Sequence, residues 1–369
     1  MRLDVIFNSA NWGMPFHFWS AVFFIFGCVV GSFLNVVIHR LPLEESIVSP
    51  PSHCPHCKYS IPWYLNIPLV TWLYLGGKCA NCGAPISIRY FLVELLTGIT
   101  FLACWIGFGP YMASIAIVYC IFLAGLIAAT FIDFEHYIIP DEITIGGAVV
   151  GFLCSLLVPP LHGTHSPGMG LWRSFQGIAV GAGLFYAVLR LGKLFFGKQK
   201  MSLPSGSKII FTETAIVLPE QEILYEELFY RKSDSVRLQA GTAELSDRCY
   251  RDVSVRLTPG KLFIGEDELI PEEVPYLEVV TDNVVLPREA MGLGDVKFMA
   301  AIGAFLGWQA VIFTLMASSI IGSVIMLTLV ALKRHSLSAR LPYGPYIAVA
   351  AVLWIFGGHG WWNSFWSMR

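Results

Sequence analysis

Long apolar stretches divide this chain, and they constrain its fold more than any other feature of the sequence. A helix of about 20 apolar residues crosses the hydrocarbon core of a bilayer and pairs all its backbone polar groups within the segment. The chain has 369 residues, of which 55% are hydrophobic and only 14% charged, and its mean hydropathy is +0.63. Soluble globular proteins of this size are less apolar. The sequence therefore predicts an α-helical polytopic membrane protein.

The apolar stretches predict about eight transmembrane helices. They cover residues 16–38, 90–108, 111–132, 141–157 and 171–196, then two helices with a tight turn within 295–332, and a last helix over 343–356. Turn-forming pairs such as Gly109-Pro110 and Pro159-Pro160 separate some of them. The N-terminus lacks a cationic segment followed by a small-residue cleavage site, so we expect no removable signal peptide.

Polar segments between the apolar stretches define the predicted domains. These are an N-terminal transmembrane segment (1–42), a tetracysteine domain (43–89), transmembrane helices (90–197), a polar insert (198–288) and further transmembrane helices (289–369). The insert holds 16 of the 26 acidic residues, in short alternating runs separated by turn signals. Because alternation is typical of half-buried strands, we expect a small β-rich domain there.

The distribution of lysine and arginine predicts the orientation of the chain, because cytoplasmic loops carry an excess of both. The residues that fall on one side of the predicted helices are Arg40, Lys58, Lys78, Arg89, Lys198, Lys200, Lys333, Arg334 and Arg340. The tetracysteine domain and the insert are therefore predicted to be cytoplasmic, with both termini on the opposite face. Membrane lipid surrounds such a protein, and no basic stripe supports binding of nucleic acid.

Two Cys-x-x-Cys pairs with 21 residues between them predict a metal site. The cysteines are Cys54, Cys57, Cys79 and Cys82. This spacing is typical of two knuckles that place four thiolates around one Zn²⁺, and four protein ligands leave no position for water. The predicted zinc is therefore structural, with His53 and His56 as neighbours of the ligands. Four unrelated thiols are the alternative.

Two aspartates stand where apolar segments end or begin. Asp133 closes the 111–132 segment, and Asp295 follows Gly292-Leu293-Gly294 at the start of the 295–332 segment. In the predicted topology both lie at the cytoplasmic boundary of the membrane. Two interpretations remain open from the residues alone. The acids cap helices or pair with Lys297, or they form a catalytic pair in which one ionised and one protonated carboxyl activate a water molecule.

Two further acids near these segments have roles that the sequence alone leaves open. Asp141, after Pro140, is interpreted as the N-cap of the next helix. Glu94 lies one turn inside the predicted 90–108 helix. It is interpreted either as the partner of Arg89 or Arg40, or as the ligand for the amino group of a bound molecule.

Four motifs, taken in order, resemble those of the bacterial type IV prepilin peptidases. They are Gly31 to Pro42, the tetracysteine cluster, Asp133 to Asp141, and Gly292 to Lys297 followed by Gly303 to Gly307. The resemblance covers most of the membrane part. His39 stands where tyrosine is expected, and the insert of roughly 90 residues lies outside the common pattern.

The resemblance implies a Gly-x-Gly-Asp aspartyl endopeptidase of the bacterial inner membrane with Asp133 and Asp295 as catalytic acids. It also implies prepilins and type II secretion pseudopilins as substrates, and N-methylation of the new terminal residue with S-adenosyl-L-methionine as methyl donor. No donor-binding residue follows from it. A proton-coupled transporter that uses the same two aspartates is the alternative function.

Overall fold

The structure of the protein is a computed structural model. It describes Phe7 and residues 17–196, 198–212, 214–219, 222–229, 234–245, 247–271, 274, 276–287, 292–332 and 341–367. The chain divides into two compact units. The first, a helical unit, consists of residues 1–186 and 293–369, and the second consists of residues 187–292.

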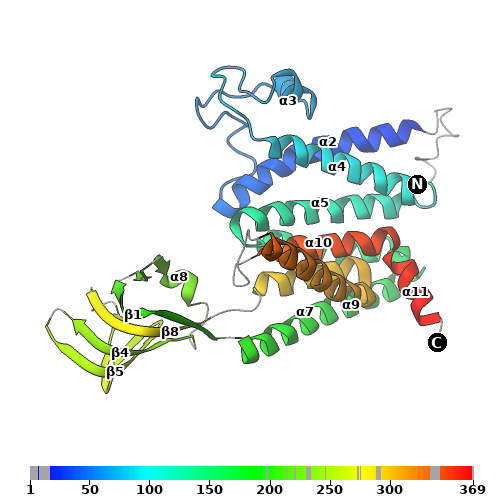
Figure 1. Cartoon of the computed structure of the whole chain (residues 1–369). Helices are drawn as coiled ribbons and strands as arrows, with labels where there is room; N and C mark the ends of the chain where they lie inside the picture. Colours follow the sequence, from blue (N-terminus) through cyan, green and yellow to red (C-terminus); the bar gives the residue numbers. More distant parts are fainter. Residues whose placement is uncertain are drawn as a thin grey trace. The chain divides into compact units, whose positions relative to one another are not determined.

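The helical unit is built from helices that lie side by side (Figure 1). In chain order they are α2 (His17–Arg40), α3 (Val70–Tyr74), α4 (Ile88–Phe108), α5 (Ala113–His136), α6 (Asp141–Leu157), α7 (Pro167–Phe196), α9 (Leu293–Ala331), α10 (Gly344–Leu353) and α11 (His359–Ser367). Short 3-10 helices cover Leu41–Leu43, Trp63–Leu65 and Pro159–His162, and a π-helical turn covers Trp354–Gly358. The last residues of α7 belong to the second unit.

Among the described residues, five helices are long and apolar enough to cross a membrane. They are His17–Leu43, Ile88–Phe108, Ala113–His136, Pro167–Leu194 and Leu293–Ala331. The prediction of a helical multi-pass membrane protein is therefore confirmed. The number of eight crossings stays a prediction, because α6 has 17 residues and α10 has 10, fewer than the usual length of a crossing helix.

Close helix contacts in this unit depend on small residues, as is common in membrane bundles. A Cβ atom placed on Gly177 of α7 would lie 2.0 Å from the carbonyl oxygen of Gly303 of α9. A Cβ atom on Gly31 of α2 would lie 2.7 Å from the Cα atom of Glu94 of α4. Larger residues at either position would force the two helices apart.

The long helix α9 contains a break at Gly307, whose φ of 80° and ψ of 173° are not helical. Such a positive φ is accessible to glycine without the steric cost that a Cβ atom brings. The break falls within the 295–332 segment, where the sequence predicts a turn between two helices. It separates residues 293–306 from residues 308–331.

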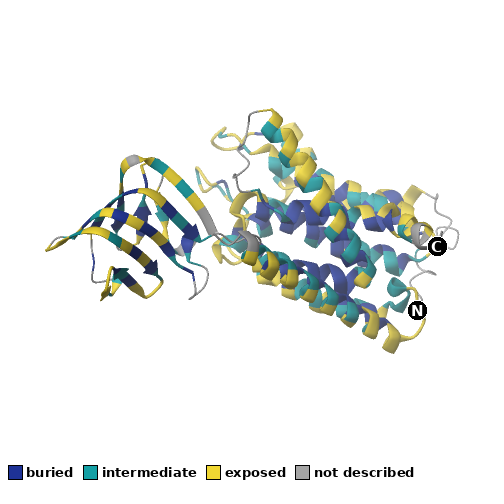
Figure 2. Cartoon of the chain, turned by 60° about the horizontal axis from the view of Figure 1, so that its bottom comes forward, coloured by how far each residue is buried: buried dark blue, intermediate teal, exposed yellow. Residues whose placement is uncertain are grey.

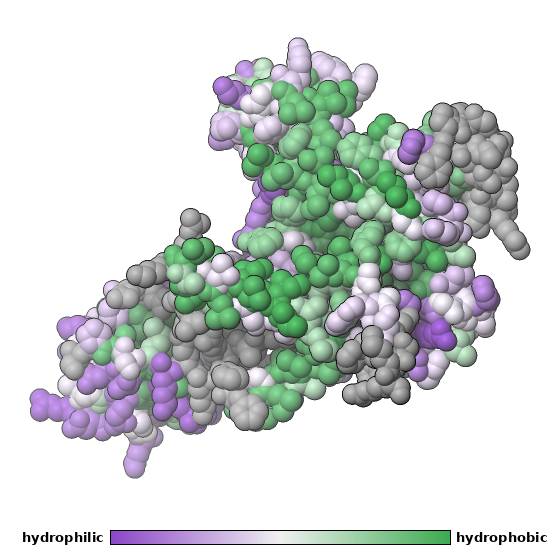
Figure 3. All heavy atoms as spheres, turned by 45° about the vertical axis from the view of Figure 1, so that its right-hand side comes forward, coloured by the Kyte–Doolittle hydropathy of each residue, from purple (hydrophilic) through white to green (hydrophobic). Residues whose placement is uncertain are grey.

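The surface of the helical unit is largely apolar where the helices face outward. Figure 2 shows buried residues along the inside of the bundle and exposed residues on its outside. Large side chains such as Ile25 and Ile320 are more than half exposed, and Figure 3 shows hydrophobic residues covering much of this unit. An apolar exterior suits helices that contact lipid.

The second unit holds one antiparallel sheet among its described residues, in the order β3-β2-β1-β8-β4-β5-β6-β7. The strands are β1 (Lys198–Thr212), β2 (Ala215–Val217), β3 (Glu222–Leu224), β4 (Val236–Leu245), β5 (Cys249–Thr258), β6 (Lys261–Ile264), β7 (Asp267–Leu269) and β8 (Tyr276–Pro287), with a short helix α8 (Tyr225–Leu228) after β3. The expectation of a β-rich insert is confirmed.

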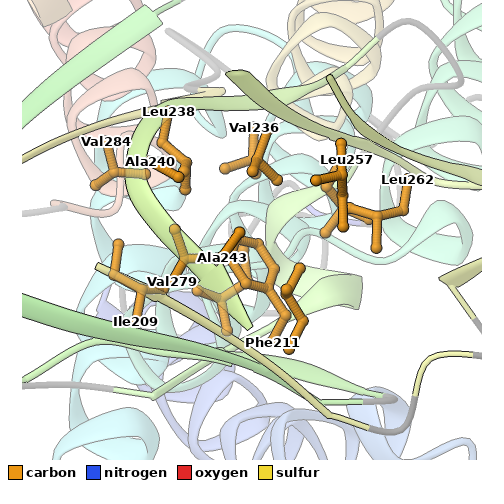
Figure 4. Packing of buried hydrophobic residues seen from close by; sticks show 14 of the residues in the cluster. Ile209, Phe211, Val236, Leu238, Ala240, Ala243, Leu257, Leu262, Val279 and Val284 are labelled. Carbon is orange, nitrogen blue, oxygen red and sulfur yellow. The ribbon is translucent and has the colours of Figure 1, made fainter. Parts of the chain in front are cut away.

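The core of the sheet follows from the alternation in its sequence. Buried and exposed residues alternate along β4, and the inward side chains of neighbouring strands meet (Figure 4). Ile209 of β1 is paired with Val279 of β8, and Leu238 of β4 with Val284. Each of these four side chains is at most 6% exposed, so the unit has a hydrophobic core of its own.

Candidate active site and metal centre

Asp133 lies in the last turn of α5 and is held from outside that helix by the first residue of α10. The residue is 5% exposed, and its Oδ2 accepts a hydrogen bond of 2.8 Å from the backbone N–H of Gly344. A Cβ atom on Gly344 would lie 2.7 Å from this oxygen and 3.1 Å from Cδ1 of Ile139. Glycine is therefore required at this position for the backbone to reach the carboxylate.

Asp295 is the third residue of α9 and is half-buried. The residue before it, Gly294, packs on the other motif, since its Cβ position lies 3.7 Å from Cβ of Ile139. Ile139 therefore contacts both the start of α9 and the start of α10, next to Asp133. The structure brings the segments that carry the two predicted acids to the same end of the helical unit.

Helix termini favour negative charge at this end. Asp295 stands in the first turn of α9, and the carboxylate of Asp133 accepts from the first residue of α10. The N-terminus of a helix carries roughly half a positive charge, which stabilises a carboxylate that lies close to it. Each acid is therefore beside the positive end of a helix.

Lys297 pairs with Asp141 rather than with either candidate acid. Its Nζ donates to the two carboxylate oxygens of Asp141 at 2.6 and 2.9 Å and thereby joins α9 to α6. Of the two interpretations left open by the sequence, the one in which Asp133 or Asp295 pairs with Lys297 is not supported by this pairing. The interpretation of Asp141 as an N-cap is wrong, because α6 begins at Asp141 itself and its carboxylate is directed to Lys297.

The expected ion pair between Glu94 and Arg89 or Arg40 is also wrong. Arg89 forms an ion pair with Glu135, two residues after Asp133, and Arg40 donates to the carbonyl oxygens of Ser46 and Pro50. Glu94 instead accepts a hydrogen bond of 2.7 Å from the backbone N–H of Leu69. Each arginine thus has its own partner near the ends of α2, α4 and α5.

The predicted cysteine cluster is assembled. The Sγ atoms of Cys54, Cys57, Cys79 and Cys82 all lie within 4.8 Å of one another. Cys54 and Cys82 are 3.8 Å apart, and Cys57 and Cys79 are 4.0 Å apart. Four thiolates at about 2.3 Å from a tetrahedral Zn²⁺ have S···S distances of about 3.8 Å. The cluster therefore has the dimensions of a metal site.

Both halves of the cluster have the same local backbone. The N–H of Lys58 donates to the carbonyl of Cys54 at 2.9 Å, and the N–H of Gly83 donates to that of Cys79 at 3.0 Å. Lys58 and Gly83 both have positive φ angles, 57° and 70°. These turns direct the two thiols of each pair to the same point.

A hydrogen bond to sulfur favours the ligating form of one thiol. The side-chain amide of Asn81 donates to Sγ of Cys57 at 3.6 Å. This bond lowers the pKa of Cys57 to about 6. The thiolate is the form that binds metal, and this hydrogen bond stabilises it at Cys57, whereas the neighbouring thiols raise the pKa of Cys82.

Gly344 and Ile139 are parts of the aspartate site that the sequence did not predict. The signal for Gly344 is Leu341-Pro342-Tyr343-Gly344-Pro345, a Pro- and Gly-rich turn directly before an apolar segment. Ile139 lies within the quoted Asp133 to Asp141 motif, but it is one of several apolar residues there and nothing in the sequence distinguishes it.

Proteins of similar sequence from several bacteria share the name prepilin leader peptidase/N-methyltransferase. The chain is 29% identical over 369 residues to a protein of Aeromonas hydrophila named prepilin leader peptidase/N-methyltransferase, covering 93% of this chain and 92% of that protein. A protein of the same name from Myxococcus xanthus is 43% identical over 188 residues, which cover 47% of this chain and 55% of that protein. Another from Dichelobacter nodosus is 35% identical over 210 residues, which cover 49% of this chain and 70% of that protein. No solved structure matches the chain.

Fold and sites define a multi-pass helical membrane protein with two aspartates beside helix N-termini and a tetracysteine cluster. Residues 25–108 match the bacterial peptidase A24 N-terminal domain, and residues 120–203 and 273–327 match the type IV leader peptidase family. The chain belongs to the type IV leader peptidase family. Residues 204–272, between the two matched parts of that family, lie within the β-sheet unit.

Proposed function

We propose that the protein is a membrane aspartyl endopeptidase that removes the leader peptide of type IV prepilins and pseudopilins and N-methylates the new terminal residue. The observation that carries the proposal is the convergence of the Asp133 and Asp295 segments on Ile139 in a chain of the leader peptidase family. The names of the relatives from Aeromonas, Myxococcus and Dichelobacter support both activities. The transporter alternative has no comparable support.

Hydrolysis by two carboxyls needs one ionised and one protonated. A hydrogen bond from the backbone N–H of Gly344 fixes the carboxyl of Asp133 and stabilises its ionised form. We propose that Asp133 and Asp295 share the roles of general base and general acid as one titrating pair.

In this mechanism the ionised carboxyl of the Asp133–Asp295 pair takes a proton from a water molecule while the oxygen of that water bonds to the scissile carbonyl carbon. The protonated carboxyl of the pair gives its proton to the carbonyl oxygen, which forms a neutral tetrahedral intermediate. The intermediate collapses when its C–N bond breaks, and the leaving nitrogen takes a proton from the pair. The products are the leader with a new carboxyl end and the mature chain with a free amine.

We further propose that the four cysteines bind one structural Zn²⁺. The S···S distances of 3.8 and 4.0 Å and the all-thiolate donor set support this metal. A closed coordination sphere would stabilise the segment around Cys54 and Cys79 without activating water. Metal analysis of the quadruple Cys→Ser variant tests the site, and zinc retained at one per chain would refute it.

The location follows from the same assignments. We propose that the protein resides in the bacterial inner membrane with about eight crossings, and that the tetracysteine domain and the insert are cytoplasmic. S-adenosyl-L-methionine would supply the methyl group in the second reaction.

Purified protein incubated with a synthetic prepilin tests the proposed function. Mass spectrometry should show loss of the leader without added methyl donor, and loss of the leader with gain of one methyl group when S-adenosyl-L-methionine is present. The peptidase assignment fails if the prepilin stays intact under conditions in which the protein is folded. The methyltransferase assignment fails if the leader is removed but no methyl group is gained.

A further inference from the structure

Glu94 is a buried carboxylate that the proposed cleavage chemistry does not use. It is 8% exposed and lies on α4, six residues after the first residue Ile88, or about 9 Å along the helix. Its Oε2 accepts from the backbone N–H of Leu69 at 2.7 Å, and the carboxyl also accepts from the hydroxyl of Ser32 on α2. Both donors are neutral, and a carboxylate buried without a cation is costly.

The arginines closest to Glu94 in the two facing helices are directed elsewhere. Arg89 pairs with Glu135, and Arg40 donates to backbone carbonyls. Within the described part of the chain, no ion pair between Glu94 and a lysine or arginine is formed. The negative charge of Glu94 thus lacks a cationic partner from these residues.

Asn35 is a second buried polar residue, and it lies on the facing helix α2, one turn after Gly31. It is 2% exposed, and its Nδ2 donates to the carbonyl oxygens of Gly31 and Tyr90 at 3.3 and 3.0 Å. Because both contacts are acceptors, they fix the orientation of the amide, and its Oδ1 has no hydrogen-bond partner among the residues that the structure describes. A buried acceptor without a donor costs about 1–3 kcal/mol.

The two residues lie on adjacent turns of the α2–α4 contact. Gly31, one turn before Asn35, packs against the backbone of Glu94, and Tyr90, one turn before Glu94, accepts from Asn35. Helix α5, which carries Asp133, packs against both α2 and α4. The Arg89–Glu135 pair joins the start of α4 to the end of α5 close to Asp133.

We propose that Glu94 and Asn35 form a site for a primary ammonium group, and that its ligand is the new N-terminus released by cleavage. The proposal rests on the proposed function and locates its second reaction. An ammonium has three N–H donors and a positive charge, so it satisfies the Oδ1 of Asn35 and neutralises Glu94 together.

The site also prepares the amine for methyl transfer. The ammonium gives one proton to the carboxylate of Glu94, which frees the nitrogen lone pair. The nitrogen then bonds to the methyl carbon of a sulfonium donor while the C–S bond breaks and its electron pair stays on sulfur. The methylated nitrogen keeps the positive charge that the sulfonium loses.

The variant Glu94→Gln separates this role from a structural one. Glutamine keeps an oxygen that accepts from Leu69, so the loop packing is retained, but the charge and the proton acceptor are lost. We expect methylation kcat/KM to fall by at least about tenfold while leader cleavage stays within about twofold. Glu142→Gln, which changes an exposed acid of α6, is the matched control and should leave both activities unchanged. Methylation by Glu94→Gln within about threefold of the parent would overturn the proposal.

Binding of peptides provides a readout that is independent of methylation. A peptide with the sequence of the mature N-terminus should bind the parent protein more tightly than its N-acetylated form, and Glu94→Gln should abolish the difference. Equal binding of the two peptides to the parent would refute the ammonium site. A parent protein that distinguishes the peptides but transfers no methyl group would refute the methyltransferase assignment and leave the site standing.

Discussion

The contact between Gly344 and Asp133 gives the sharpest prediction for a single residue. In Gly344→Ala the added Cβ would lie 2.7 Å from Oδ2 of Asp133 and 3.1 Å from Cδ1 of Ile139, both closer than van der Waals contact allows. Because Asp133 and Ile139 are buried, the strain is relieved only if the carboxylate or the start of α10 moves. Either movement lengthens the hydrogen bond of 2.8 Å between Gly344 and Asp133.

The magnitude follows from the type of hydrogen bond that is lost. A hydrogen bond to a charged group contributes about 1.5–3 kcal/mol, which corresponds to a loss of about 10- to 150-fold in the rate of leader cleavage. The assay is kcat/KM for a synthetic prepilin, measured in detergent together with the melting temperature of the variant. The reasoning is refuted if Gly344→Ala is as well folded as the parent and cleaves within about threefold of it.

Gly125→Ala is the matched control, because Gly125 lies on α5 and, beyond the adjacent backbone of its own helix, no atom of the described residues would lie within 4 Å of its Cβ. Alanine in a helix interior is more favourable than glycine by up to about 1 kcal/mol, so this variant should be at least as stable as the parent. Its cleavage rate should be unchanged.

The remaining predictions concern a pH effect, an ion pair and the insert. His162 donates to or accepts from Ser155 at 2.8 Å, and burial lowers its pKa to about 4. Between about pH 6.5 and 4 the unfolded state then binds more protons than the folded state. The contribution of His162 to the unfolding free energy should therefore be constant above pH 6.5 and fall by roughly 3 kcal/mol at most as the pH is lowered to 4. The variant His162→Gln should show a smaller decrease in melting temperature over this pH range. Lys297 and Asp141 are 41% and 57% exposed, so Lys297→Met should lower the unfolding free energy by less than about 1 kcal/mol, as checked by thermal unfolding. Replacing residues 198–287 by a flexible linker should lower kcat/KM at low salt and flatten its salt dependence if the acidic insert attracts basic leaders, whereas identical salt profiles would leave it as an accessory domain.

Much of the fold follows from local sequence pattern. Apolar stretches form helices because backbone groups in hydrocarbon must be paired within the segment, and alternation along residues 236–240 places every second side chain in the core of the sheet. The cysteine spacing was sufficient to predict the cluster, since each Cys-x-x-Cys turn fixes its two thiols locally.

The partners of the charged residues could not be predicted in the same way. Asp133 accepts a hydrogen bond from Gly344, which lies 211 residues later in the chain. Lys297 pairs with Asp141, which lies 156 residues earlier. Such pairs depend on how the helices pack against one another, and the periodicity of a sequence does not determine this packing. The partner of Glu94 could not be predicted either. Glu94 accepts from the backbone N–H of Leu69 and not from an arginine, and any residue except proline has such an N–H.

The central claim is that Asp133 and Asp295 together hydrolyse the leader peptide bond. The most direct test measures prepilin cleavage by Asp133→Asn and Asp295→Asn, each shown to be folded by its melting temperature and metal content. We expect both single variants to lose cleavage by at least about a thousandfold, because neither asparagine can exchange a proton with water or the carbonyl oxygen. Cleavage by either variant within about tenfold of the parent would contradict it.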